Sequence, residues 1–138
     1  MTPETGLLVA SGLHLGFQAV VTVVVYPALA TTPGADWDVV HAAHSRRISV
    51  VVGPLYLVVA AACLWVLVAG PHSAAAIVAV AGHAVAGGTT AAFAAPSHGR
   101  LGGAGAAGPD RTEIVRLLRA DRVRLLATVV ALVAALLV

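Results

Sequence analysis

The sequence contains no lysine, a single cysteine and few charges of either sign. Charged residues make up 10% of the 138 residues, whereas soluble globular proteins carry about 25%. Hydrophobic residues make up 59%, and a soluble domain of this length could not keep so much apolar surface away from water. The composition therefore excludes a soluble globular domain and indicates one small integral membrane domain.

Two further absences narrow the class of protein. Cys63 lies alone in an apolar stretch, so there is no disulfide framework and no cysteine-based metal motif. No basic residue precedes Arg46, so the first apolar stretch lacks the basic flank of a signal peptide, and we expect it to be a retained span. The net charge of +2 is carried by arginines next to apolar stretches, which indicates membrane topology rather than a nucleic-acid partner.

Four apolar stretches are each close to the ~20 residues that cross a bilayer as an α-helix. They cover residues 7–29, 48–69, 74–95 and 117–138. Open strands are excluded because backbone groups in lipid must be satisfied within the segment. The sequence therefore predicts an all-α fold in a single domain, residues 1–138: a transmembrane up-down four-helix bundle, with a short interfacial helix before the second span and an amphipathic start to the fourth.

Local signals set the expected boundaries. Gly70–Pro71 predicts a tight turn between the second and third spans. Thr32–Pro33 is a typical helix start ahead of the second span, and Asp110 is a typical cap for the helix that leads into the fourth, with Glu113 as its capping-box partner. Small residues in the third span favour close helix packing: Gly82, Ala84, Ala86 and Gly88.

All eight basic residues are arginines, and they fall within Arg46–Arg47 and Arg100–Arg124. These stretches separate the first span from the second and the third from the fourth. Since basic loops stay in the cytoplasm, we expect a multi-pass protein of the plasma (inner) membrane with both termini outside. The expected partners are the lipid bilayer and a hydrophobic small molecule; a homo-oligomer stays open.

Polar residues within spans are costly and are therefore functional candidates. His14 and Gln18 share one face of the first span, and His83 lies at a similar depth in the third. Parallel spans one and three could turn both imidazoles towards one interior. They could bind a metal, a haem or a buried substrate, or they could be neutral histidines that bond only to neighbouring helices.

Asp38, His41 and His44 are spaced three residues apart, just before the second span. Their side chains fall on one helical face, and two imidazoles with a carboxylate suit iron, copper or zinc. The alternatives are no cofactor at all, or an interfacial helix whose histidines face water.

Further polar residues flank the third and fourth spans. His98 and Arg100 follow the third span, and Asp121 and Arg124 can pair at the start of the fourth. The predicted topology gathers one group of polar residues at the cytoplasmic end of the bundle: Tyr26, His41, His44, Arg46, Arg47, His98, Asp121 and Arg124.

Short motifs recur in order along most of the chain. They are Tyr26–Pro27, His41-x-x-His44, Gly53–Pro54, Pro96-x-His98 and Asp121-x-x-Arg124. In this order the motifs resemble those of the small four-span membrane proteins of the anthrone-oxygenase-like family. The resemblance implies an oxidoreductase that oxygenates a hydrophobic, aromatic or polyketide-like small molecule.

The resemblance also implies roles for particular residues. His41 and His44 would hold a metal or act as a general base. Arg47 and Arg124 would stabilise an enolate or a dioxygen anion, and Asp121 and His98 would orient them. Of the expected substrate contacts, the resemblance covers Tyr26, whereas His14, Gln18 and His83 are expected from their place within the spans.

Two other classes of function stay open. One is a non-catalytic accessory or structural membrane protein. The other is a haem or quinone redox carrier that uses His14 and His83. A proton-coupled transporter is disfavoured, because none of the six acidic residues lies deep in a span.

Overall fold

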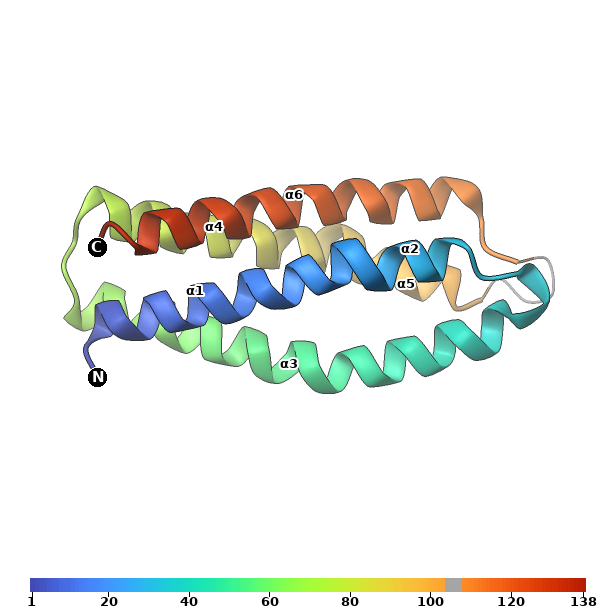
Figure 1. The fold of residues 1–138 in the computed structure, drawn as a ribbon, viewed down its shortest axis with the longest axis horizontal. Coiled ribbons are helices and arrows are strands. Elements are labelled where there is room, and N and C mark those ends of the chain that lie inside the picture. Colours follow the sequence, from blue (N-terminus) through green and yellow to red (C-terminus); the bar gives the residue numbers. More distant parts are fainter. Residues whose placement is uncertain (104–107) are drawn as a thin grey trace.

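The computed structural model describes residues 1–103 and 108–138, which form four long helical segments and no strand (Figure 1). The first segment joins α1 (Pro3–Val20), the π-helical turn η1 (Val21–Val25) and α2 (Tyr26–Ala30). The second joins the 3₁₀ turn η2 (Gly34–Asp36) and α3 (Trp37–Ala69). The third joins α4 (Ala74–Thr89), the π-helical turn η3 (Thr90–Ala94) and α5 (Ala95–Leu101), and the fourth is α6 (Arg111–Ala135). The predicted all-α fold is confirmed for these residues.

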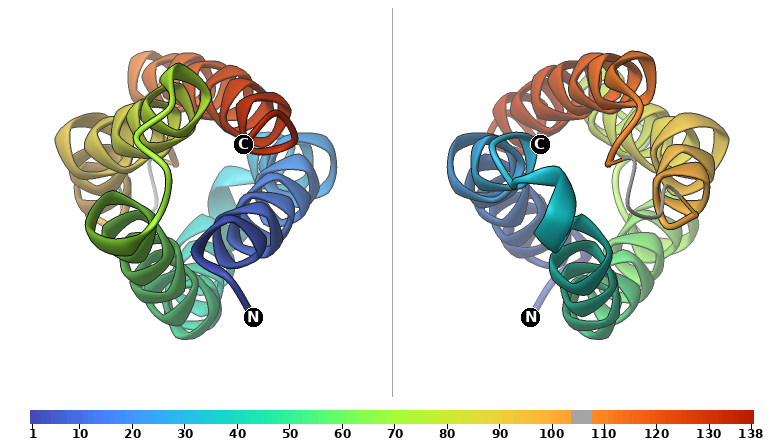
Figure 2. Two further views of the ribbon diagram at one scale, coloured as in Figure 1. Left: turned by 90° about the vertical axis from the view of Figure 1, so that its left-hand side faces the viewer. Right: turned by 90° about the vertical axis from the view of Figure 1, so that its right-hand side faces the viewer.

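The four segments run up and down around a common axis (Figures 1 and 2). Helix α1 packs against α3 and α6, and α4 packs most extensively against α6. Helices α3 and α4 are joined by a short turn at Gly70 but contact each other much less. Both chain ends lie at the end of the bundle that holds this turn (Figure 1). The second and third segments are therefore the more loosely packed neighbours in the bundle.

Three of the four segments are long and apolar enough to cross a membrane: Pro3–Ala30, Gly34–Ala69 and Ala74–Leu101. The chain is therefore a multi-pass membrane protein by helix length and composition. The predicted fourth span, residues 117–138, coincides largely with α6 but is not among them. Its first half holds four charged residues, which lower its apolar character: Arg119, Asp121, Arg122 and Arg124.

Some predicted boundaries are confirmed and others are wrong. The break at Gly70–Pro71 is present, and the Asp110 side chain caps α6 by accepting from the Thr112 amide at 2.8 Å. The prediction of a separate interfacial helix before the second span is wrong, because α3 is continuous from Trp37 to Ala69. Its start is Trp37 rather than Thr32–Pro33, since the 3₁₀ turn comes first.

Small residues allow α4 and α6 to lie close together. Of the four small residues predicted for this packing, Gly82 and Ala86 lie at the contact. A Cβ added at Gly82 would lie 2.8 Å from the carbonyl oxygen of Ala127 and 3.0 Å from the Cβ of Ala131. Ala86 is fully buried, whereas Ala84 and Gly88 are exposed. The packing face thus follows Gly82 and Ala86 in steps of four residues.

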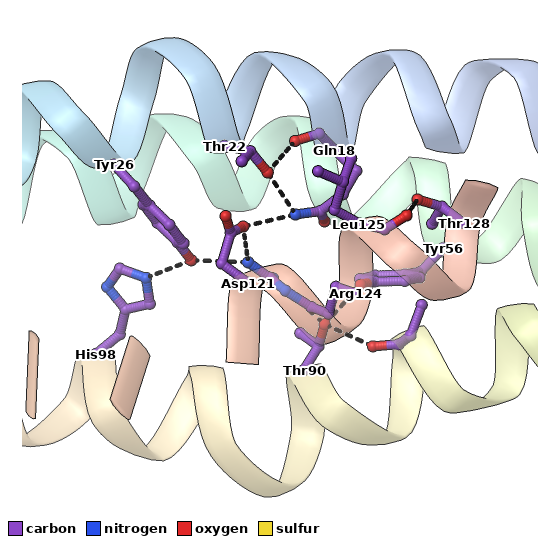
Figure 3. Close-up of polar contacts among 11 residues, drawn as sticks. Gln18, Thr22, Tyr26, Tyr56, Thr90, His98, Asp121, Arg124, Leu125 and Thr128 are labelled. Atoms are coloured by element: carbon purple, nitrogen blue, oxygen red, sulfur yellow. Dashed lines mark hydrogen bonds and ion pairs between the residues drawn. The ribbon is translucent and has the colours of Figure 1, made fainter. Parts of the chain in front are cut away.

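Each of the two π-helical turns widens its segment by one residue. The Tyr26 amide bonds to the carbonyl of Val21, and the Ala95 amide bonds to that of Thr90. In a regular helix, at about 100° per residue, Tyr26 would lie about 80° away from Gln18. The wide turn absorbs one residue, and both side chains then point into the bundle (Figure 3).

Candidate functional site

A buried ion pair lies at the centre of the bundle (Figure 3). The Arg124 guanidinium donates to Asp121 at 3.0 Å, and the two residues are 4% and 2% exposed. Arg124 also donates to the Tyr26 hydroxyl at 3.0 Å and reaches Thr90 at 3.4 Å. Gln18 donates to the same Asp121 oxygen at 2.6 Å. The pair is thus held by side chains from the first and third helical segments, which satisfies charges that would be costly if alone.

A group of three histidines lies next to this ion pair, towards the arginine-rich end. The Nε2 atom of His41 lies 3.2 Å from Nδ1 of His98, and the two rings are stacked. The other ring nitrogen of His98 lies 3.4 Å from the Tyr26 hydroxyl. His44 faces the His98 ring with a centroid separation of 5.6 Å. The structure therefore connects His41, through His98 and Tyr26, to Arg124.

Trp37 fixes one side of this histidine group. Its ring is fully buried and stacks on His41 at 5.1 Å between centroids. Its indole N–H donates to the Leu101 carbonyl at 2.9 Å, which ties the start of α3 to the end of α5. A buried indole needs such a partner.

His14 and His83 form a second histidine pair in the other half of the bundle. Their Nδ1 atoms lie 3.0 Å apart, and Nε2 of His83 lies 2.8 Å from the Ser11 hydroxyl. Both residues are at most 5% exposed. Their imidazoles therefore both face the interior of the bundle, at the same level along its axis. The rings contact each other directly, with centroids 5.2 Å apart, and no haem fits between them in this arrangement.

A cavity of about 270 Å³ opens beside the ion pair and the first histidine group. Most of its wall is apolar: Phe17, Val21, Ile48, Val52, Ala94 and Ala95. Four polar side chains of the lining contact one another at one corner: Tyr26, His44, His98 and Arg124. The polar lining also includes Ser45, Ser49 and Thr90. Such a space suits an apolar molecule that carries one polar group.

Three of the residues that line this cavity have a buried polar atom without a hydrogen-bond partner in residues 1–103 and 108–138. These atoms are Nε2 of His44, Oγ of Ser45 and Nε of Arg124. A buried polar atom without a partner costs about 1–3 kcal/mol. A ligand with hydrogen-bonding atoms would offset that cost.

The structure does not bring the predicted metal ligands together. Within the part of the chain that the structure describes, no group of three or more His, Cys, Asp or Glu side chains is arranged to hold a metal ion. Asp38 is exposed, whereas His41 is buried against Trp37 and His98. Metal binding by Asp38, His41 and His44 stays a prediction, and in this structure their side chains are not gathered around one point.

The remaining predicted cations point elsewhere. Arg46 and Arg47 are exposed on α3, and neither lines the cavity. Arg47 instead borders a shallow outer depression with His44. Of the two arginines that the resemblance makes catalytic, the structure brings only Arg124 to the polar corner.

Glu113 has a role that the sequence did not predict. Instead of closing a capping box, it is buried and accepts from Arg100 at 2.9 Å, Arg116 at 2.6 Å and Ser97 at 3.0 Å. The Arg100 hydrogen bond is the main reason that the pKa of the Glu113 carboxyl is held below its usual value. This cluster fastens α5 to α6 beneath the histidine group.

Sequence reasoning also missed Tyr56 and Thr90, whose side-chain oxygens lie 2.6 Å apart and connect α3 to η3. Both are polar residues within predicted spans, so the rule applied to His14 and Gln18 could have found them.

Compared with known protein families, with curated proteins and with solved structures, the chain shows no match.

Proposed function

We propose that this protein is a small integral membrane enzyme of the anthrone-oxygenase-like kind, which oxygenates a hydrophobic aromatic or polyketide-like molecule. The observation that supports this proposal is the cavity with a mainly apolar wall and a corner at which His44, His98 and Arg124 gather beside Tyr26. A flat apolar substrate would lie along the wall with its oxygen at the corner. Neither a purely structural bundle nor a haem carrier needs that arrangement.

Arg124 would supply the positive charge at this corner. Its guanidinium is shared with Asp121 and Tyr26, which hold it in position before a ligand binds. A fixed cation in a site with little water stabilises an oxyanion that develops during the reaction. An enolate or phenolate oxygen next to Arg124 is the group that this corner fits best.

The imidazoles would supply the base. His98 and His44 both line the cavity, and a neutral imidazole nitrogen can accept a proton from a bound substrate. The Nδ1 atom of His98 contacts His41, while its Nε2 atom lies towards Tyr26. A proton taken from the substrate by His98 could therefore be passed towards the arginine-rich end.

The proposed reaction uses dioxygen as the oxidant. The base removes a proton from a CH₂ group activated by a carbonyl, and the enolate oxygen faces Arg124. The carbanion gives one electron to dioxygen, and the resulting radical pair combines to form a C–O bond. The resulting peroxide anion takes back the proton from the base, and the hydroperoxide so formed loses water, so CH₂ plus O₂ becomes C=O plus H₂O. The residues needed are a base and a cation, both present at the corner.

We also propose the orientation. The arginine-rich end, with residues 31–36, 102–103 and 108–110, would face the cytoplasm, and α6 would be the fourth span of a plasma-membrane protein with both ends outside. The polar residues of α6 that support this are Asp121 and Arg124, which face the bundle rather than lipid.

Oxygen consumption with anthrone as the probe tests the enzyme directly. Purified protein in lipid nanodiscs should consume one O₂ for each anthrone converted to anthraquinone. Arg124→Gln and His98→Gln should each lower the rate at least tenfold, while Arg122→Gln, an exposed arginine two residues away, should keep it. Anthrone binding without oxygen uptake would contradict the oxygenase and favour a binding or accessory protein.

A further inference from the structure

We propose that the ligand of this site carries a hydrocarbon tail, which lies in a groove between α3 and α4 while its polar head occupies the cavity. This inference rests on the proposed function and adds the substrate class: an aromatic head with an acidic or enolisable oxygen and a long apolar chain. Three features support it: the apolar lining of the groove, its position next to the cavity, and the hydrogen-bonding groups in the two spaces.

The groove has a volume of about 590 Å³. It follows α3 from Tyr56 to Leu67, which is about 16 Å at 1.5 Å per residue. Its wall is mostly aliphatic: Val59, Ala60, Cys63, Leu64, Leu67, Val80, Ala84 and Ala91. It forms where α3 and α4 pack loosely. Several of its lining residues are exposed on the outside of the bundle, including Leu64, Leu67 and Ala84, so the groove would open to the lipid.

The groove and the cavity lie next to each other, because Thr90 lines both spaces. The Thr90 hydroxyl is bonded to Tyr56 at 2.6 Å on the groove side and is 3.4 Å from Arg124 on the cavity side. One elongated molecule could therefore reach from the polar corner into the groove beside this contact.

The groove and the cavity differ in the hydrogen-bonding groups that their walls offer to a ligand. In the groove, Tyr56 and Thr90 bond to each other, and both ring nitrogens of His83 are taken by Ser11 and His14. The groove wall thus offers its occupant hardly any free polar partner, which suits hydrocarbon. The cavity wall holds the unpartnered atoms of His44, Ser45 and Arg124. The head belongs in the cavity and the tail in the groove.

Two neighbouring glycines allow a matched test. Gly87 lines the groove, and a Cβ added there meets open space. Gly88 also has open space at its Cβ but does not line the groove. Gly87→Leu should therefore fill the groove, and Gly88→Leu should add the same side chain outside it.

The probes are anthrone and an anthrone bearing a ten-carbon alkyl chain. Binding is measured without oxygen in phosphatidylcholine nanodiscs, with affinity expressed per mole of lipid because both probes partition into the bilayer. Wild type and Gly88→Leu should bind both probes with affinities within about threefold, since lipid and groove are similarly apolar. Gly87→Leu should lose at least tenfold affinity for the tailed probe only.

The outcomes separate the two proposals. If Gly87→Leu leaves the tailed probe unaffected, or weakens both probes equally, the tail does not lie in the groove, and the proposed function stands. If wild type binds neither probe, the proposed function fails together with this inference.

A second measurement needs no variant. A diazirine at the end of the alkyl chain should label wild-type residues 60–67 and 80–84, and excess unlabelled tailed anthrone should suppress that labelling. Labelling confined to other lipid-facing segments, such as the exposed face of α6, would overturn the inference even if Gly87→Leu failed to fold.

Discussion

Gln18 and Asp121 are joined by a 2.6 Å hydrogen bond between the first helical segment and the last, and both side chains are almost completely buried (Figure 3). The bond ends on the carboxylate oxygen that also pairs with Arg124. The neutral amide of Gln18 thus supports a charged pair inside an apolar bundle.

Removing one partner of the ion pair should be much more damaging than removing both. Asp121→Leu leaves the Arg124 cation buried without a counter-charge and should lower the free energy of unfolding by about 3–5 kcal/mol. Asp121→Leu combined with Arg124→Met should recover most of that loss. Unfolding in mixed detergent micelles measures both. Arg122→Gln, which is exposed, should change the value by less than about 0.5 kcal/mol. A double variant no better than Asp121→Leu alone would contradict this account.

The Glu113 cluster should make stability depend on acidity. The folded pKa of Glu113 is below its usual value, so its ion pairs contribute fully above that usual value and are lost as the pH falls through the lower folded one. Wild type should therefore be more stable than Glu113→Gln at neutral pH, and the difference should shrink below about pH 4. Thermal unfolding between pH 3 and pH 7 measures it.

The control for this pH series is Asp36→Asn. Asp36 is exposed and forms no ion pair among the residues that the structure describes. Its difference from wild type should be small at every pH. A difference for Glu113→Gln that grows in acid would show that the carboxylate does not stabilise the fold.

Close packing of α4 on α6 should not tolerate even a methyl group at Gly82. The added Cβ would approach the Ala127 carbonyl to 2.8 Å, so Gly82→Ala should destabilise by about 1–3 kcal/mol through overpacking. Gly88→Ala meets nothing within 4 Å and should be neutral or stabilising by up to about 1 kcal/mol. Equal effects of the two variants on unfolding would show that the helices do not approach at Gly82.

The proposed orientation predicts which positions react in intact cells. In a Cys63→Ala background, an impermeant maleimide should label His72→Cys and Leu137→Cys from outside. Gly103→Cys should react only after lysis. The reverse pattern would invert the molecule, and protection of Leu137→Cys alone would mean that α6 does not cross.

Much of the fold follows from composition. Apolar length predicts the helices, and Gly70–Pro71 and Asp110 predict two boundaries that the structure has. The interfacial helix predicted before the second span is not a separate element, because nothing between Trp37 and Ala69 stops the helix. Local sequence gives the tendency to form a helix, but continuity depends on the helices packed beside it.

The candidate site was less accessible to sequence. Polar residues in apolar stretches marked His98, Asp121 and Arg124, which the structure brings together. Pairings such as Gln18 with Asp121 depend on which helices are neighbours and on their rotation, and neither is encoded in spacing. Exposure of Arg47 likewise depends on how α3 is turned.

The wide turn at Val21–Val25 has a consequence for how this chain can vary in length. Since it already accommodates one surplus residue, deleting the lipid-facing Val24 would restore a regular helix and leave Gln18 and Tyr26 on the same side. The same deletion at Leu13, within the regular part of α1, would turn everything before it by about 100°. Single-residue gaps should therefore be tolerated there and in Thr90–Ala94, and both turns contribute residues to the cavity wall.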